Sequence, residues 1–309
     1  MTLCIAAECT DGTKDDPAIV LCRDWQAQKG SITSDDAYKQ RNVGDGCRVL
    51  FAGYPTRADH LLLACEPAIK AFMEKSNPAD TDIDSDKLVQ DLRVATKLTR
   101  REYVNSWIAT TLNMEFEEFL KYGRTQFHES HYHDIWETIK RYDIGAELLI
   151  TLFDAEGLQV IIRTDGLGEV HYESDYSIIG SGGEIARAFL CQVDYDPTKL
   201  SVGQCIYEVL RAKFAAEHSK EVGSDTTIVV TSKGKKDRWL SQGGHDFYDG
   251  LLYPYQTPKV DMPDGVLETD DDEVSSKDEQ EAVKSGDVGA GQSSASEVPP
   301  TSSSTAEEK

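Results

Sequence analysis

Hydrophobic and polar residues over roughly the first 235 positions follow two different periods. Short apolar runs rich in branched residues, bounded by turn sequences such as GDG and DAEG, predict β-strands. These strands are expected at residues 2–8, 18–22, 47–53, 148–153, 158–163, 176–179 and 226–231. Longer stretches with apolar residues on one side of a 3.6-residue period predict helices. These helices are expected at residues 58–73, 86–107, 115–142, 184–193 and 201–218.

The order of these elements is strands, helices, strands, helices and a last strand. Two sheets packed face to face, with helices outside them, would bury every apolar face in this order. The sequence therefore predicts an α+β fold, an αββα four-layer sandwich. Period and order alone also fit other α+β arrangements.

The predicted domain covers residues 1–240 and contains an enlarged helical region at about 75–145. An aromatic extension at 241–260, with the sequence FYDGLLYPY, is expected to pack back onto the domain or onto a neighbouring subunit. Residues 261–309 contain 14 acidic residues, three lysines and no aromatic residue. Such a segment cannot bury enough apolar surface to offset the entropy of ordering, so we expect a disordered, acidic, serine-rich tail.

The net charge of −23 argues against a nucleic-acid partner, because phosphate binding needs a basic patch. Seven cysteines without a CxxC motif suggest reduced, packed thiols of a cytoplasmic protein. The N-terminal residues lack the basic start and long apolar stretch of a signal peptide. No window approaches 18 apolar residues, so no membrane span is expected.

Six short motifs stand out along the first 234 residues. They are Met-Thr at the start, CRDWQ, a lysine after SDDAY, VLFAGYPTRAD, IIGSGGEIARAFL and EVGSDTTIVVTSKG. Each motif alone is weak, but together they have the order and spacing found in proteasome β-type subunits. From residue 2 to about 234 the chain resembles this family of N-terminal-nucleophile (Ntn) threonine hydrolases, including the small bacterial proteasome-like proteins that also begin Met-Thr.

The resemblance implies a catalytic site built on Thr2. Removal of Met1 would leave Thr2 with a free amine that serves as the base for its own hydroxyl. Lys39 stands where the family has its active-site lysine, which would favour the deprotonated nucleophile, and Asp24 would hold that lysine. The backbone N–H of Gly53 corresponds to the family's oxyanion donor.

The resemblance assigns supporting roles to three further residues. Ser181 corresponds to the family's serine near the threonine amine, and Glu221 and Ser224 fall on its Asp-x-x-Ser pair. No cofactor is implied. The expected partners are peptide or unfolded-protein substrates, further copies of the chain in a ring, and an ATP-dependent unfoldase.

The chain departs from the family pattern at three places. Gln26 stands two residues after Asp24, where the family commonly has arginine. Glu221 stands where aspartate is usual and is one methylene longer. The helical region between Gly53 and Gly145 is also longer than in a standard subunit.

Two other functions fit the same sequence. One is a catalytically inactive shell or scaffold subunit, although the family's shell chains carry an N-terminal extension. The other is an Ntn amidase or acylase that acts on small amides through the same Thr2 chemistry. Substrate profiling would separate the latter from a peptidase.

Two features suggest other chemistry, a metal site and a cysteine nucleophile, but each has a simpler explanation. The sequence HESHYH at 128–133 suggests a metal site, but no cysteine or acidic triad completes a ligand set, so a solvated helix end is favoured. Cys4 lies two residues too deep to be an N-terminal nucleophile. Packing within a strand accounts for it better.

Overall fold

The computed structural model describes residues 2–11, 16–24, 27–29, 32–34, 39–75, 85–219 and 222–252. The chain divides into two units, Met1–Gln256 and Thr257–Lys309, and every described residue belongs to the first. The predictions for the tail at 261–309, and those for Met1, Gln26 and Glu221, concern residues outside the described part.

The first sheet brings together strands from both ends of the folded unit. Its strand order is β10 (Tyr176–Ile179), β1 (Cys4–Thr10), β2 (Pro17–Asp24), β11 (Thr226–Ser232) and β12 (Arg238–Trp239), with all neighbours antiparallel. Cys4 lies opposite both Ile179 and Arg23, and Asp24 lies opposite Thr226. This register places the start of β1, the end of β2 and the start of β11 next to one another, at the same end of the inner strands.

The second sheet is also antiparallel throughout. Its order is β5 (Gln40–Gly44), β6 (Cys47–Gly53), β7 (Ala146–Phe153), β8 (Gln159–Thr164) and β9 (Val170–Glu173). The short strands β3 (Ala27–Lys29) and β4 (Ile32–Ser34) pair with each other as a separate two-stranded sheet. The central pair β6–β7 joins residues about one hundred positions apart, with Gly53 opposite Ala146.

Both faces of the central strands are buried, which explains their continuous apolar runs. Along β1, Cys4 and Ala6 belong to a cluster shared with Leu50 and Leu149 of the second sheet. The alternate residues, Ile5 among them, pack into a separate cluster with α5 (Gly183–Gln192) and α6 (Val202–Glu217). One strand face therefore joins the two sheets and the other joins the helices.

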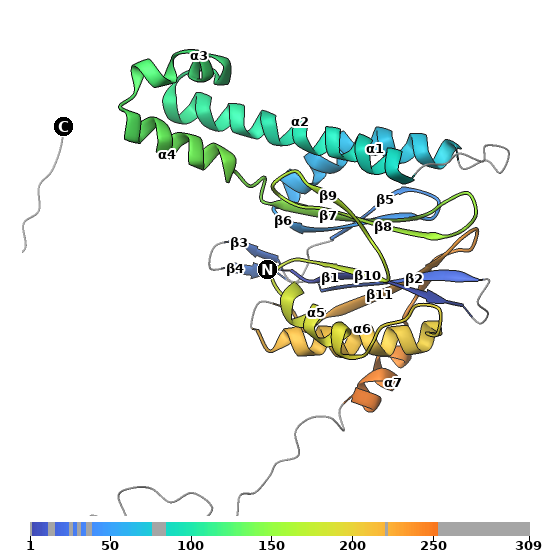
Figure 1. Cartoon of the computed structure of the whole chain (residues 1–309). Coiled ribbons are helices and arrows are strands. Elements are labelled where there is room, and N and C mark those ends of the chain that lie inside the picture. Colours follow the sequence, from blue (N-terminus) through green and yellow to red (C-terminus); the bar gives the residue numbers. More distant parts are fainter. Residues whose placement is uncertain are drawn as a thin grey trace, which may run out of the picture. The chain divides into compact units, whose positions relative to one another are not determined.

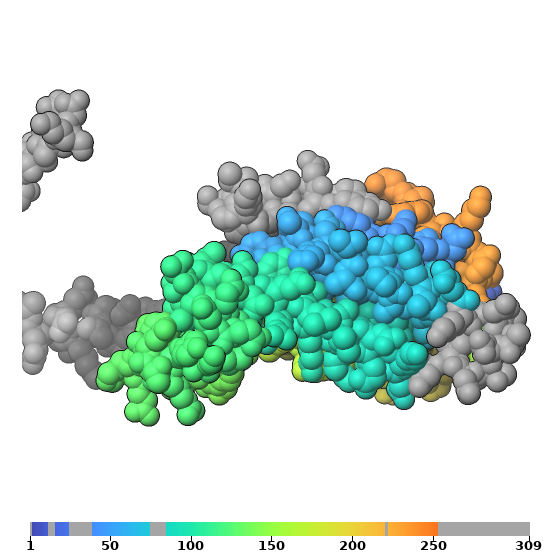
Figure 2. Space-filling view, turned by 90° about the horizontal axis from the view of Figure 1, so that it is seen from above, coloured from blue at the N-terminus to red at the C-terminus, as the bar shows by residue number. Residues whose placement is uncertain are grey.

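Helices lie on the outer face of each sheet (Figure 1). Helices α5 and α6 cover the first sheet, and α1 (Pro55–Lys75) and α2 (Ser85–Leu112) cover the second. Figure 2 shows α1 and α2 side by side across one face. The predicted mixture of helices and sheets is confirmed. Within the described residues, no helix combines the length and apolarity needed to cross a membrane.

The single helix predicted at 115–142 is wrong, because the segment forms two helices. They are α3 (Phe116–Gln126) and α4 (Glu129–Lys140), separated by extended backbone at Phe127 and His128. The break turns the chain back. The rings of Phe127, at the break, and Tyr132, beyond it, therefore pack on Phe119, with ring centroids 6.3 Å and 5.2 Å away. Packing of aromatic side chains onto one buried ring outweighs continuation of the helix.

Helix α7 (Gln242–Leu252) lies in the segment described above as an aromatic extension. Its Tyr248 hydroxyl donates to the carbonyl oxygen of Gly203 on α6 at 3.1 Å. Tyr248 and Leu252 also pack against the cluster between the first sheet and its helices. The described part of the extension therefore lies against α6, whereas residues 253–260 are outside the described residues.

Candidate active site

The described residues of the predicted site come from the ends of strands in both sheets. Asp24 ends β2 and Gly53 ends β6. Thr2 precedes β1, and Lys39 directly precedes β5. Ser181 follows β10, and Ser224 precedes β11. Glu221, the seventh predicted residue, lies outside the described residues. Strand ends carry loops and side chains that need not fill the core, so they can present polar groups around one point.

Asp24 is the residue that connects most of these groups. Its Oδ1 accepts from the backbone N–H of Leu3 at 3.1 Å and from Lys39 Nζ at 2.5 Å. Its Oδ2 accepts from the backbone N–H of Gly223 at 3.1 Å. The side chain is fully buried, so each of these charge-assisted bonds is shielded from water. Asp24 thus fixes Lys39 and the backbone directly after Thr2.

Thr2 is buried and is held by its backbone. Its backbone nitrogen donates to Ser181 Oγ at 3.3 Å. Its carbonyl oxygen lies against Gly180, where a Cβ atom would come within 2.1 Å of that oxygen. Gly180 also has φ of +94°, which favours glycine. The turn after β10 therefore approaches Thr2 more closely than any side-chain-bearing residue would allow.

Lys39 is buried beside Asp24, with only 3% of its side chain exposed. Its carbonyl oxygen accepts from the backbone N–H of Phe51 at 3.1 Å, which extends the β5–β6 pairing to Lys39. A lysine held at the end of one sheet thus reaches the carboxylate at the end of the other. The structure brings Asp24 and Lys39 together.

Gly53 occupies the end of β6 with φ of +94° and an exposed backbone. A Cβ atom here would lie 2.2 Å from the carbonyl oxygen of Gly145, so no other residue fits without rearrangement. That same carbonyl accepts from the backbone N–H of Tyr54 at 2.9 Å. The close pairing of Gly53 with the start of β7 explains the glycine without reference to catalysis, and its role as an oxyanion donor stays a prediction.

Glu147 lies between the second sheet and the turn after β10, and the sequence did not identify it. It lies opposite Ala52 in the β6–β7 pair, and its Oε2 accepts from the backbone N–H of Gly180 at 3.1 Å. Burial raises the pKa of its carboxyl group, and the hydrogen bond from Gly180 opposes this effect. The one available signal was a lone acidic residue near the start of the apolar strand AELLITLF. Glu147 connects the Gly53 end of the second sheet with the turn that contacts Thr2.

Ser224 is exposed, and its backbone carbonyl accepts hydrogen bonds from the side chains of Lys213 and Thr226. Lys213 Nζ lies 2.6 Å from that carbonyl oxygen. The neighbouring Gly223 supplies the N–H that reaches Asp24. The proposed support of the threonine amine by Ser224 therefore stays a prediction, and Lys213 is a second residue that the sequence analysis did not identify.

Cys4 is a fully buried thiol in the cluster between the two sheets. Its Sγ donates to the carbonyl oxygen of Phe51 at 3.6 Å. Burial raises the pKa of Cys4 well above its ordinary value, and the nearby Lys39 only partly opposes this effect. A thiol kept neutral in this way is a poor nucleophile, which agrees with a packing role.

The histidines at 128–133 make local contacts. His128 Nδ1 lies 2.9 Å from Ser130 Oγ, and the ring of His131 packs edge-on against Phe127. Over the described residues as a whole, no group of three or more histidine, cysteine or acidic residues could hold a metal ion.

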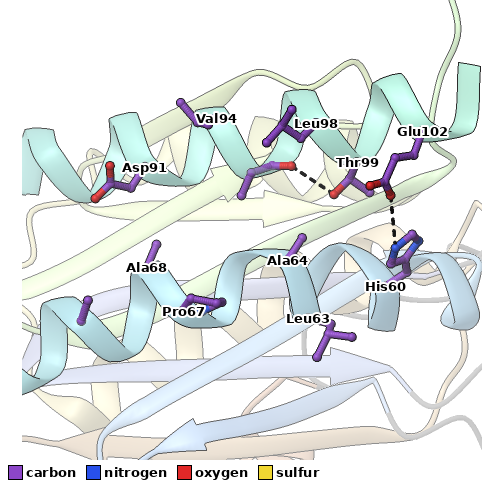
Figure 3. A pocket seen from close by; sticks show the side chains of 12 residues that line it. His60, Leu63, Ala64, Pro67, Ala68, Asp91, Val94, Leu98, Thr99 and Glu102 are labelled. Carbon is purple, nitrogen blue, oxygen red and sulfur yellow. Dashed lines mark hydrogen bonds and ion pairs between the residues drawn. The ribbon is translucent and has the colours of Figure 1, made fainter.

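A groove between α1 and α2 is separate from this site (Figure 3). It has a volume of about 600 Å³ and is lined mainly by apolar side chains such as Leu63, Val94 and Leu98. At one end His60 Nε2 lies 3.5 Å from Glu102. None of the predicted site residues lines the groove.

Comparison with known proteins finds similarity at the level of structure. The crystal structure of eukaryotic HslV from Trypanosoma brucei has 18% sequence identity and a TM-score of 0.44, and the match covers 74% of this chain and 99% of that chain. The sequence matches no protein-family model and no curated protein. A similarity of this size does not identify the function of the chain.

Proposed function

We propose that the chain is an N-terminal-nucleophile threonine hydrolase that cleaves peptide bonds through Thr2, and that its two sheets and outer helices form the αββα sandwich of that class. The observation that carries the proposal is the buried Asp24 carboxylate, which holds Lys39 Nζ and the N–H of Leu3 directly beside Thr2. Apolar residues could replace a buried carboxylate–lysine pair without loss of stability in many proteins, so the presence of this pair next to a threonine supports a functional role.

In the proposed reaction, removal of Met1 turns the Thr2 nitrogen into a free amine. In the structure this nitrogen donates a hydrogen bond to Ser181 Oγ. Thr2 Oγ1 attacks the carbonyl carbon of the scissile peptide, and its proton passes to that amine. The Gly53 N–H stabilises the oxyanion, and the departing amine takes the proton. Water then hydrolyses the resulting ester on Thr2, which releases the acyl group as a carboxylic acid and regenerates the hydroxyl.

Lys39 acts in this scheme through its position beside Asp24. Its positive charge disfavours protonation of the Thr2 amine and stabilises the deprotonated hydroxyl. The three hydrogen bonds to Asp24 hold the cation in place during the reaction. The family resemblance assigns Glu221 and Ser224 to the support of the amine.

We further propose that copies of the chain assemble into a ring that encloses the sites, with peptides or unfolded proteins as substrates and an ATP-dependent unfoldase as a partner. Cytoplasmic location is part of this proposal. An inactive shell subunit and an amidase for small amides remain the competing functions, and turnover of peptides separates the proposed peptidase from both.

The test is hydrolysis of a broad panel of fluorogenic peptides by the wild-type chain, Thr2→Ala and Thr2→Ser. Alanine permits the same removal of Met1 but lacks the hydroxyl, so hydrolysis should disappear, whereas serine should retain part of it. Thr110→Ala, on the exposed surface of α2, is the matched control and should match wild type. Unchanged turnover in Thr2→Ala would rule out the proposed chemistry. A wild type that cleaves no peptide would favour the shell or amidase function.

A further inference from the structure

Lys213 is fully buried on α6, at a position that belongs to the apolar stripe of that helix. Val209, Leu210 and Ala216 occupy the same stripe at helical spacing and pack against the first sheet. Burying a lysine here costs free energy unless its side-chain nitrogen finds polar partners. An apolar residue would fill the position at a lower cost in free energy of folding. The contacts of Lys213 therefore point to a role beyond packing.

Lys213 Nζ has two partners of different kinds. One turn along α6, the carboxylate of Glu217 forms an ion pair with it. Glu217 is 22% exposed and can be hydrated without the lysine. The second partner is the carbonyl oxygen of Ser224, 2.6 Å away, in the segment that leads into β11. This second bond runs from the helix layer toward the candidate active site.

The segment that Lys213 holds contacts the site on two sides. The N–H of Gly223 donates to Asp24 Oδ2 at 3.1 Å. Val222 packs against Gly182, where a Cβ atom would lie 2.4 Å from Val222 Cγ2. Gly182 directly follows Ser181, the residue that accepts from the Thr2 nitrogen. Displacement of this segment would therefore disturb both the carboxylate that holds Lys39 and the turn that holds Thr2.

We propose that Lys213 is a positioning residue for the hydrolytic site: its bond to the Ser224 carbonyl fixes the Gly223 N–H on Asp24 and so keeps Asp24 and Lys39 aligned beside Thr2. The effect on catalysis rests on the proposed function, whereas the effect on Gly223 does not. The ion pair with Glu217 offsets the burial of Lys213 but does not reach the site.

The experiment compares the full-length wild type with Lys213→Met, Lys213→Arg and Glu217→Gln. For each protein, kcat and KM for a fluorogenic peptide are measured, together with hydrogen exchange of the Gly223 amide and of the β11 amides. Lys213→Met removes the bond to Ser224 while keeping an unbranched apolar chain. It should lower kcat by about 10- to 100-fold, the size expected for a small misplacement of reacting groups. Its KM should stay near wild type, because the substrate contacts are not changed.

The exchange data should follow the same pattern. In Lys213→Met the Gly223 amide should exchange faster while the β11 amides keep their wild-type rates. Lys213→Arg retains a cationic donor and should restore much of the protection and of kcat. Glu217→Gln leaves the bond to Ser224 in place, so Gly223 protection and kcat should match wild type, although loss of the ion pair should lower the stability. If Lys213→Met does not fold, Lys213→Met with Glu217→Leu removes the same bond and replaces the ion pair by apolar residues, a change that often preserves stability.

Wild-type exchange at Gly223 in a folded Lys213→Met or double variant would overturn the proposal. Equal losses in Lys213→Met and Glu217→Gln would also overturn it, because the ion pair rather than the Ser224 bond would then be responsible. If the wild type cleaves no peptide, the proposed function fails, and the Gly223 exchange still decides whether Lys213 positions the segment.

Discussion

Lys39 Nζ lies 2.5 Å from Asp24 Oδ1, with 3% of the Lys39 side chain and none of Asp24 exposed to solvent. Lys39 approaches from the second sheet and Asp24 from the end of β2 in the first. A carboxylate buried in this way also needs its other lone pairs satisfied, and the N–H groups of Leu3 and Gly223 do so. The pair therefore connects the two sheets at the strand ends where Thr2 lies.

Replacement of Lys39 by methionine should destabilise the protein as well as inactivate it. The substitution leaves Asp24 as a buried carboxylate without its cation, which costs on the order of 3–5 kcal/mol. Urea denaturation measures the change in the free energy of unfolding. The control is Glu117→Gln, which breaks the exposed pair with Arg101 and should cost no more than about 1 kcal/mol. A loss in Lys39→Met no larger than that of the control would show that the pair is not buried as described.

Gly180→Ala should damage both folding and activity. The added Cβ atom would meet the Thr2 carbonyl oxygen, and the backbone at φ of +94° disfavours any other residue. Left-handed backbone alone costs a non-glycine residue about 1–2 kcal/mol, and displacement of Thr2 should abolish turnover. Gly234→Ala is the matched control, since it has φ of +67° but nothing within 4 Å of the new atom. Similar melting temperatures and turnover for the two variants would contradict the close approach.

The sequence predicted the strands of the site better than its contacts. Apolar runs located β2, β6 and β11, because strands buried on both faces carry nearly continuous apolar sequences. The pairing of Asp24 with Lys39 came from the family resemblance. Neither periodicity nor composition identified Glu147 and Lys213, because the role of a single charged residue within an apolar element depends on partners that these patterns do not show. The break between α3 and α4 was missed for a similar reason, as it depends on aromatic packing around Phe119.

Glu8 should make the stability of the protein depend on pH. Burial, with the nearby Asp175 charge, raises the pKa of the Glu8 carboxyl group from 4.5 to about 7. The folded protein therefore keeps this proton up to about pH 7, whereas the unfolded chain loses it near pH 4.5. The stability that Glu8 contributes is full below pH 4.5 and is lost as the pH rises through 7.

Glu8→Gln, which stays neutral, isolates this effect. At pH 8 the variant should unfold with a free energy up to about 3 kcal/mol higher than wild type, and the difference should shrink toward pH 5. Denaturant titrations of both proteins at several pH values between these limits give the difference directly. A difference that is constant over this range would mean that Glu8 titrates at its ordinary pKa.

Whether Thr2 becomes an N-terminal nucleophile can be measured by peptide mass spectrometry after treatment with an acylating β-lactone. Ring opening by a hydroxyl adds the whole mass of the lactone to the residue that attacks. We expect the N-terminal peptide to begin at Thr2, without Met1, and to carry the added mass on the Thr2 side chain. A peptide that retains Met1, or a Thr2 side chain left unmodified by the lactone, would contradict this expectation.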